Sequence, residues 1–463
     1  MQRTGENMKV AIIGTGYVGL TTAVVLATLN HDVVAVDKDE RKLSLLHAGK
    51  TPIHEPSLQN LFDKVRHTIH FTPDVNEAVP EAKVILITVG TPLKNGEADT
   101  QHVKQAALEV AQVCHLDRRY TLAIKSTVPI GTNRHVAKIV EKVFAARGIR
   151  GNVSVASNPE FLQEGLALQG AFYPDRIVVG ADCEQAVDTL RRLYQPILEQ
   201  TFDPPSSLPR PADYHSPPLV TTDPNSAEML KYAANTFLAL KISFINEIAG
   251  LCEKVGADVT EVAQGIGLDS RIGPRFLNAG IGWGGSCYPK DTAALLNIAA
   301  QSGYTMPITE AARTVNSRQR EHIIEKLQDA LKTLRGKTIG ILGLAFKPNT
   351  DDIREAPALN IIRRLIVEGA NVRAHDPVAI QNAKHTLNGF PVVFTSNVCE
   401  LSHNADALVL ITDWDEYQNI DLRGLAKRMN TPLLIDGRNV YVPKEAEAAG
   451  FHYIGIGRRF DRV

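Results

Sequence analysis

The glycine-rich stretch Gly14-Thr-Gly16-Tyr-Val-Gly19 constrains the fold of this chain more than any other feature of its sequence. It follows the apolar run Lys9-Val-Ala-Ile-Ile13 and precedes apolar residues at helical spacing that continue to Leu29. In such a strand–turn–helix unit, the first glycine permits a tight turn and the second lets the backbone approach a pyrophosphate. The third lets the helix pack on the strand, and the helix amides face the phosphates. The stretch therefore predicts a dinucleotide-binding turn at the start of a parallel α/β domain.

An acidic residue, Asp37, ends the next strand pattern, residues 32–37. It lies roughly 20 residues after the first glycine, where a carboxylate accepts hydrogen bonds from a ribose diol and repels a 2′-phosphate. NAD is therefore predicted in preference to NADP. Further strand patterns at 83–89 and 121–125 alternate with helical patterns, so the NAD-binding domain is expected to span residues 8–200.

The rest of the chain divides by composition and periodicity. Residues 201–224 are rich in Pro and Ser and predict a long loop. Residues 225–325 are mainly helical in pattern, and 225–255 predicts one long helix. A second series of strand patterns occupies 335–463. The predicted fold is α/β, with two Rossmann-like doubly wound domains joined by a long central helix and a helical middle region.

Charge and cysteine content exclude several kinds of partner. The 50 basic and 51 acidic residues give a formal net charge of −1, so no overall field attracts nucleic acid or an anionic membrane. No apolar run reaches the roughly 18 residues of a membrane span. The five cysteines are scattered and form no Cys-x-x-Cys, which argues against a disulfide framework and a metal site. We expect a cytoplasmic protein without metal, nucleic acid or membrane partners.

The stretch GIGWGGSCYPKD, residues 280–291, places Cys287 among four glycines. Pro289 predicts a helix start, and the field of a helix N-terminus together with Lys290 favours the thiolate. Asp291 follows four residues after the cysteine and can face the same way. A small buried cysteine in a glycine turn is the alternative, but the helix start and the charged neighbours favour a nucleophile.

In two stretches of the chain, polar residues are spaced as they would be on one face of a helix. Glu228, Lys231 and Asn235 share one face of the predicted long helix, where they either line a site or cap a network. Glu160 and Glu164 are four residues apart and share a face if a helix starts near Pro159. They serve either as a general base and a ligand holder or as exposed first-turn acids.

A degraded version of the first glycine turn occurs at Gly340-Ile-Leu-Gly343-Leu-Ala345. The basic residues Lys347 and Arg354 follow it in a polar loop, where they are suited to the phosphates of a second nucleotide-like ligand. Plain α/β packing beside a solvated charged face is the alternative.

Six stretches together resemble the UDP-glucose/GDP-mannose dehydrogenase family: GTGYVGL, KSTVPIGT, SNPEFLQEG, AEMLKYAANTFLALKISFINEIA, GGSCYPKD and GLAFKPNTDDIRE. The motifs occur in order from residue 8 to about residue 440. Within that family, SRIGPRFLNAGIGWGGSC most resembles the UDP-glucose branch, although Trp283 stands where phenylalanine or tyrosine is frequent.

The resemblance implies a four-electron oxidation in which the C6 alcohol of UDP-glucose becomes the carboxylate of UDP-glucuronate, for polysaccharide biosynthesis, while two NAD are reduced in turn. Cys287 would attack the intermediate aldehyde, giving a thiohemiacetal and then a thioester that water hydrolyses. The same chemistry on GDP-mannose or a UDP-N-acetylhexosamine is the nearer alternative. A two-electron hydroxyacid dehydrogenase with a structural Cys287 and an NAD-sensing interaction module are more distant ones.

The resemblance also implies roles for individual residues. Lys231 and Asn235 would stabilise oxyanions, Asp291 would order water with Lys231, and Glu160 with Thr127 would position or activate the hydrolytic water. The implied catalytic set is Cys287, Lys231, Asn235, Asp291, Glu160 and Thr127. The implied NAD contacts are Gly14, Gly16, Tyr17, Val18, Gly19, Asp37, Lys42, Thr91, Thr127, Glu164 and Arg354. The implied sugar-nucleotide contacts are Glu160, Phe161, Leu162, Lys231, Asn235, Arg271, Gly284, Lys347 and Arg438. Arg271 would reach the sugar site of a neighbouring subunit, so a homodimer is implied.

Overall fold

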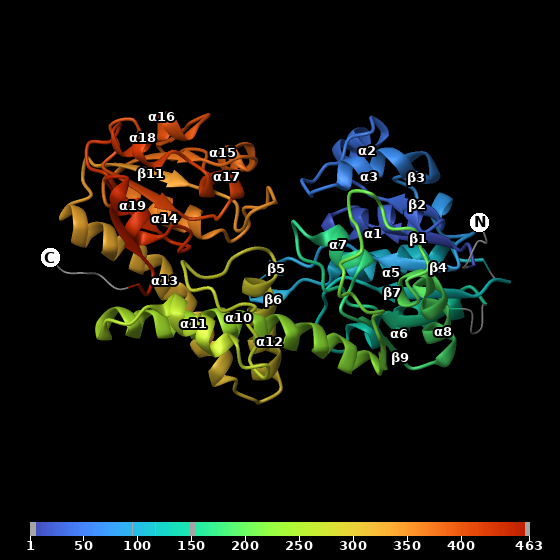
Figure 1. Ribbon diagram of the computed structural model, residues 1–463. Coiled ribbons are helices and arrows are strands. Elements are labelled where there is room, and N and C mark those ends of the chain that lie inside the picture. The colour runs from blue at the N-terminus through green and yellow to red at the C-terminus, as the bar shows by residue number, and fades with distance from the viewer. Residues whose placement is uncertain (1–5, 95, 116, 149–152, 459–463) are drawn as a thin grey trace. The chain divides into compact units, whose positions relative to one another are not determined.

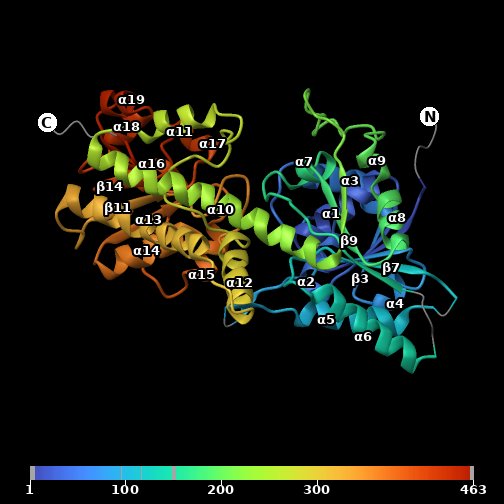
Figure 2. The ribbon, with the colours of Figure 1, turned by 90° about the horizontal axis from the view of Figure 1, so that it is seen from below.

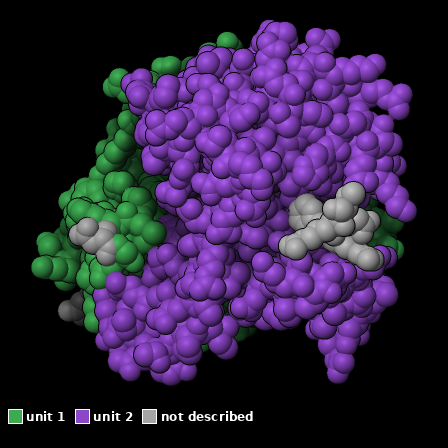
Figure 3. Space-filling model, turned by 90° about the vertical axis from the view of Figure 1, so that its left-hand side faces the viewer, with its two compact units in different colours: residues 1–233 green, residues 234–463 purple. Residues whose placement is uncertain are grey.

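The computed structural model describes residues 6–94, 96–115, 117–148 and 153–458. The chain forms two compact units, Met1–Ala233 and Ala234–Val463, which Figure 3 shows in separate colours. Each unit contains a largely or wholly parallel sheet flanked by helices (Figure 1). The predicted α/β class with two Rossmann-like domains and a helical middle region is confirmed.

The sheet of unit 1 has eight strands in the order β10-β9-β8-β7-β4-β1-β2-β3. Neighbouring strands are parallel except β8 and β9, which are antiparallel. The run β3-β2-β1-β4-β7-β8 has the usual Rossmann order, 3-2-1-4-5-6. The strand bounds are β1 Lys9–Ile13, β2 Asp32–Val36, β3 Ile69–Thr72, β4 Val84–Ile87, β7 Tyr120–Ile124, β8 Val153–Ser157, β9 Ile177–Ala181 and β10 Leu219–Thr222.

Helices cover both faces of this sheet. Alternate residues of β1 enter two different cores, with Val10 and Ile12 in one and Ala11 and Ile13 in the other. Figure 2 shows α5 and α6 on one face and α1 and α8 on the other. Burial on both faces explains why the central strands are apolar at successive positions. The helices are α1 Tyr17–Thr28, α2 Glu40–His47, α3 Leu58–Val65, α4 Val75–Ala78, α5 Gln101–Val113, α6 Thr132–Ala146, α7 Ala167–Phe172, α8 Glu184–Leu193 and α9 Gln195–Leu198, with a 3₁₀ turn at Arg66–Thr68 and a hairpin of β5 Leu93–Lys94 and β6 Glu97–Ala98.

The Pro/Ser-rich stretch crosses the surface of unit 1 without a helix up to residue 223, includes strand β10 and ends at Pro224, where α10 begins. Phe202 and Tyr214 pack on the core, each with its ring centroid 5.3 Å from that of a neighbouring aromatic residue, Phe172 and Tyr173 respectively. Strand β10 pairs in parallel with β9 at the edge of the sheet. The composition did not predict this strand, because it is only four residues long and directly follows the Pro-rich run.

The sheet of unit 2 has six parallel strands in the order β13-β12-β11-β14-β15-β16, again 3-2-1-4-5-6. The strands are β11 Thr338–Leu342, β12 Asn371–His375, β13 Val392–Phe394, β14 Ala407–Leu410, β15 Leu433–Asp436 and β16 His452–Gly455. The helices around them are α14 Pro357–Val367, α15 Ile380–Thr386, α16 Val398–Ser402, α17 Asp415–Gln418, α18 Leu422–Ala426 and α19 Pro443–Ala448.

The middle of the chain is helical, as predicted. Helix α10 spans Pro224–Val255, 32 residues, so its first turns belong to unit 1 and the remainder to unit 2. The other helices are α11 Val259–Gly267, α12 Tyr288–Gln301 and α13 Pro307–Leu331. Within the described ranges, none of the helices combines the length and apolar character that a membrane crossing requires.

Candidate active site

The first glycine turn has the geometry that its sequence predicts. Gly14 has φ +104°, and its amide donates to Val36 O across 2.7 Å. A Cβ on Gly19 would lie 1.8 Å from Gly14 O, so only glycine lets α1 approach the turn. A Cβ on Gly16 would meet nothing within 4 Å. The protein therefore leaves space beside the second glycine and the N-terminus of α1, which begins with Tyr17 and Val18.

Asp37 is held as a hydrogen-bond acceptor at the end of β2. Its Oδ2 accepts from Thr15 N at 2.8 Å, Thr15 Oγ1 at 2.7 Å and Lys42 Nζ at 3.3 Å. Burial raises the pKa of this carboxyl, but the hydrogen bonds from Asp39 N and Thr15 and the charge of Lys42 leave the pKa below its ordinary value. An ionised carboxylate beside an open glycine turn suits NAD.

Two further residues expected to contact NAD lie together at the ends of neighbouring strands. Thr91 Oγ1 donates to the carbonyl of Thr127 across 2.7 Å. Arg354, by contrast, belongs to unit 2, where its Nε lies 2.9 Å from both carboxylate oxygens of Asp352.

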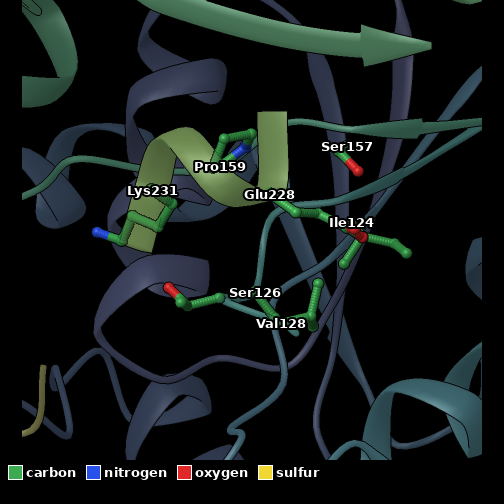
Figure 4. Close-up of a pocket in the computed structure, with 8 residues that line it drawn as sticks. Ile124, Ser126, Val128, Ser157, Pro159, Glu228 and Lys231 are labelled. Carbon is green, nitrogen blue, oxygen red and sulfur yellow. The ribbon is translucent and has the colours of Figure 1, made fainter. Parts of the chain in front are cut away.

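Unit 1 has a pocket at the carboxyl ends of β7 and β8 (Figure 4). Side chains from the loops after these strands and from α10 line it: Ile124, Ser126, Thr127, Val128, Ser157, Pro159, Glu228 and Lys231. This end of a parallel sheet is the usual position of ligand sites in doubly wound folds.

A buried ion pair joins α10 to the loop after β8. Lys231 Nζ lies 3.2 Å from Glu160 Oε1, and the two side chains are 3% and 7% exposed. Glu160 Oε2 also accepts from Leu162 N at 2.5 Å. Two cations lie near the Phe161 ring, with Lys231 Nζ 5.2 Å and the Arg176 guanidinium carbon 3.9 Å from its centroid.

The loop that carries Glu160 and Glu164 is not helical. The condition under which Glu160 and Glu164 would share a helix face is therefore not met, since α7 begins only at Ala167. The loop is held instead by Glu55, whose buried carboxylate accepts from Gly165 N at 2.6 Å and Ala167 N at 2.7 Å. Sequence analysis missed Glu55, and its only local signal is an acid between His54 and Pro56 in an otherwise apolar and proline-rich stretch.

Glu228, the third residue of the polar face predicted on α10, reaches a different loop. Its Oε2 accepts from Gly131 N at 2.6 Å and its Oε1 from Asn133 N at 2.8 Å. Burial raises the pKa of Glu228 to about 7, although the two amide hydrogen bonds act to lower it. In Figure 4, Glu228 and Lys231 leave α10 toward opposite sides.

In unit 2, the glycines around Cys287 permit close approach of the backbone to other segments. A Cβ on Gly284 would lie 2.4 Å from Glu355 O, and one on Gly285 would lie 2.7 Å from the ring of Phe346. Cys287 is half-buried and immediately precedes α12, which begins at Tyr288 as predicted. The thiol thus lies at a helix N-terminus, where the helix field favours the thiolate.

Asp291 lies one turn into α12 and is fully buried. Asn235 Nδ2 donates to its Oδ2 across 2.6 Å, and Lys290 Nζ lies 2.6 Å from its Oδ1. The amide of Asp291 donates to Cys287 O across 2.8 Å. The structure therefore places Asn235 of α10 and Lys290 on either oxygen of Asp291, in the helix turn that begins at the thiol.

Trp283 is part of the packed interior of unit 2. It is 6% exposed, and its indole N–H donates to Ser243 Oγ across 3.0 Å. Asn316 accepts from the Trp283 amide at 2.7 Å and donates to its carbonyl at 3.0 Å. These contacts fix the glycine loop to α10 and α13.

The second glycine turn closes on a carboxylate of the protein itself. Asp376 Oδ2 accepts from Leu344 N at 2.7 Å and Ala345 N at 3.0 Å. The Arg438 guanidinium contacts carbonyl oxygens, with Nε 2.8 Å from Ile411 O and Nη1 3.3 Å from Gly282 O, and burial lowers its pKa. It therefore joins the turn after β14 to the glycine loop.

Two other expected sugar-nucleotide contacts lie at the surface or near it. Lys347 Nζ is 5.5 Å from the Phe346 ring centroid in the loop after β11. Arg271 is exposed in the loop after α11 and pairs with Asp269, Nη2 to Oδ2 2.6 Å.

The three domain models of one protein family match this chain in order. The NAD binding domain of the UDP-glucose/GDP-mannose dehydrogenase family matches residues 8–198, its central domain residues 225–318 and its UDP binding domain residues 340–443.

Similar proteins cover nearly the whole chain. The UDP-glucose 6-dehydrogenase TuaD of Bacillus subtilis is 45% identical over 453 residues, which are 97% of this chain and 93% of TuaD. The UDP-glucose 6-dehydrogenase of Rhizobium meliloti is 42% identical over 459 residues, 97% of this chain and 100% of that protein. The solved structure of a UDP-glucose dehydrogenase from Pyrobaculum islandicum has a TM-score of 0.87 and 36% identity, covering 99% of each chain.

Proposed function

Because the chain belongs to the UDP-glucose/GDP-mannose dehydrogenase family, we propose that it oxidises UDP-glucose to UDP-glucuronate through a thioester on Cys287. NAD is the cofactor, and bound at the glycine turn it would supply the hydride acceptor for both oxidations. The observation that carries the proposal is the identity of 45% with TuaD across almost all of both chains. Residues at the glycine turn and at Cys287 supply the chemistry that this activity needs.

Cys287 accounts for the second oxidation. Hydride is transferred from a carbon that also bears a hydroxyl group, and an aldehyde carbon bears none. A nucleophile must therefore add to the aldehyde before the second oxidation. Attack of the Cys287 thiolate forms a tetrahedral thiohemiacetal, and loss of hydride from its carbon leaves a thioester. Water then cleaves the carbon–sulfur bond, releasing the carboxylate and the thiolate. The position before α12 supports the thiolate form.

Lys231 and Glu160 are assigned to the charges and the water of this reaction. The Lys231 ammonium would stabilise the oxyanions of both tetrahedral adducts. Glu160, with Thr127, would position the hydrolytic water and take its proton. The buried ion pair of 3.2 Å supports these roles, because it keeps a cation and a potential base together away from solvent.

Asn235 and Asp291 are assigned to the neighbourhood of the thiol. Asn235 would donate to an oxyanion and Asp291 would order water, in agreement with their contact across 2.6 Å in the turn that begins at Cys287. Lys347 and Arg438 would bind the UDP group, within the range matched by the UDP binding domain. Gly284, Phe161 and Leu162 would contact the sugar through their backbones and the Phe161 ring.

A homodimer forms part of the proposal. Phe237, Phe244 and Leu251 are 61%, 47% and 58% exposed and follow each other at seven-residue spacing along α10. An apolar stripe of this period typically packs against another helix. Arg271 would extend from one subunit to the sugar site of the other.

The first test is the yield of NADH from limiting UDP-glucose with excess NAD. We expect two NADH for each sugar, whereas one would indicate a two-electron dehydrogenase and a structural Cys287. No NADH would favour GDP-mannose or a UDP-N-acetylhexosamine, which would be assayed next. The Cys287→Ser variant is the matched control, because it removes the thiol and keeps the size. We expect it to lose steady turnover.

A further inference from the structure

Helix α6 begins without a side-chain cap from its own segment. Its first residue follows Gly131, which has φ +91° and no side chain to accept the orphan amides. The first amides of a helix need acceptors when they are buried. The Thr132 amide donates to Pro129 O across 3.1 Å, but the Gly131 and Asn133 amides donate to Glu228 on α10, about a hundred positions further along the chain.

The segment that Glu228 holds contains Thr127. Residues 125–131 connect β7 to α6, so the Glu228 contacts fix the far end of this connection. The near end is fixed by Ser126 Oγ, which donates to Val89 O across 2.7 Å, and by Thr91 at the Thr127 carbonyl. Of these anchors, Glu228 alone comes from α10.

Glu228 also shares its helix turn and its pocket with Lys231. Both side chains line the pocket together with Thr127 (Figure 4). Glu228 and Lys231 are both almost fully buried, so neither can move without repacking its surroundings. One turn of α10 thus holds the 125–131 connection through Glu228 and the 158–162 loop through Lys231.

From this arrangement we propose that Glu228 is a positioning residue for the hydrolytic half of the reaction. By holding Gly131 and Asn133, it fixes Thr127 relative to Lys231 and Glu160 in unit 1. The inference rests on the proposed function, since it concerns the water that cleaves the thioester. Misplacement of a catalytic group by about 1 Å can lower a rate by about 100-fold.

The decisive variant is Glu228→Gln, which keeps the size but turns an N–H group toward one backbone amide. We expect hydrolysis of the thioester to slow by about 10- to 100-fold while hydride transfer changes little. Rapid mixing with UDP-glucose and NAD should then give a burst of two NADH for each active site before a slow steady rate. Intact-protein mass spectrometry should find the UDP-glucuronyl adduct on Cys287 during that steady phase.

The matched control is Asp223→Ala, which removes the side chain that caps the same helix. Asp223 caps α10 through Asn225 N at 2.9 Å and Ser226 N at 3.2 Å, and these contacts are to α10 itself. Its loss tests general weakening of the helix, which would lower the thermal midpoint without producing the adduct. If Glu228→Gln loses turnover with no adduct and no larger burst than Asp223→Ala, the positioning role is overturned.

A second readout does not depend on activity. Hydrogen exchange at the Gly131 and Asn133 amides should be at least about tenfold faster in Glu228→Gln than in the wild type. Glu228→Asp keeps the charge but is one methylene shorter, so its exchange rates at these amides should lie between those of the wild type and Glu228→Gln. It serves as the test variant if Glu228→Gln proves too unstable. Unchanged exchange would overturn the inference, whereas a wild-type yield of one NADH for each sugar would overturn the proposed function itself.

Discussion

The side-chain amide of Asn235 on α10 donates to Asp291 Oδ2 on α12 across 2.6 Å. Lys290 Nζ lies 2.6 Å from the other oxygen of the same carboxylate, which is fully buried. A buried carboxylate is stable only with such partners. The first turn of α12, which begins beside Cys287, is therefore held to α10 by a charged hydrogen-bond network.

Replacement of Asp291 by Asn should lower kcat about 100-fold with a smaller change in KM for UDP-glucose. The replacement removes the negative charge that holds Lys290 and Asn235 beside the reacting thiol, so these groups would stabilise the transition state less well. Steady-state NADH production measures both constants. Asp329→Asn, an exposed acid on α13, is the control and should behave as the wild type. Wild-type turnover in Asp291→Asn would remove this residue from the catalytic set.

Gly16 and Gly19 should respond differently to alanine. Gly19→Ala places a methyl group 1.8 Å from Gly14 O and should lower the thermal midpoint or prevent folding. Gly16→Ala meets no protein atom within 4 Å, so its thermal midpoint should be unchanged. NAD affinity, measured by calorimetry, should nevertheless fall at least about tenfold, because the added methyl group would occupy the space that the pyrophosphate needs. Undiminished affinity in Gly16→Ala would show that the dinucleotide binds elsewhere.

Glu253 should contribute to stability in a pH-dependent way. It accepts from Lys326 Nζ at 2.8 Å, His322 Nε2 at 3.0 Å and Gly457 N at 2.7 Å. Burial raises its pKa, but His322, Lys326 and the Gly457 amide together lower the pKa from 4.5 to about 2. A lowered pKa means that the unfolded chain binds the proton more readily, so stability is present above pH 4.5 and is lost as the pH falls toward 2.

Glu253→Gln should therefore reduce the free energy of unfolding by about 3 kcal/mol at pH 7. Urea denaturation at a series of pH values measures this difference, which should shrink steadily below pH 4.5. If the difference in free energy of unfolding between the wild type and Glu253→Gln stays constant down to pH 2, the interaction lost in the variant is steric and not ionic.

Phe244→Glu should convert the proposed homodimer to monomers, because a carboxylate in the middle of the apolar stripe cannot be buried against a second helix. Sedimentation velocity measures the mass in solution. The control is Val367→Glu on α14, a similarly apolar and 76% exposed position away from the stripe, which should leave the mass unchanged. An equal shift in both variants, or none in Phe244→Glu, would place the interface on another surface.

Features set by neighbouring residues could be predicted from the sequence. The turn at Gly14, the span of α10 and the start of α12 at Tyr288 follow from glycine positions, apolar periodicity and a proline in the first helical turn. The sequence left open whether a helix starts near Pro159, and none does, because the loop after β8 is held by Glu55 and Lys231 in place of helical hydrogen bonds of its own.

The sequence by itself determined two α/β sheets, the dinucleotide turn and the chemical identity of the reactive residues, because each depends on a short run of amino acids. Only the tertiary structure decided which carboxylates hold which loops. Glu55 and Gly165 are 110 residues apart, and Glu228 and Gly131 are 97 apart. Contacts at such separations form only when packed helices and strands bring the segments together, so no local pattern can encode them.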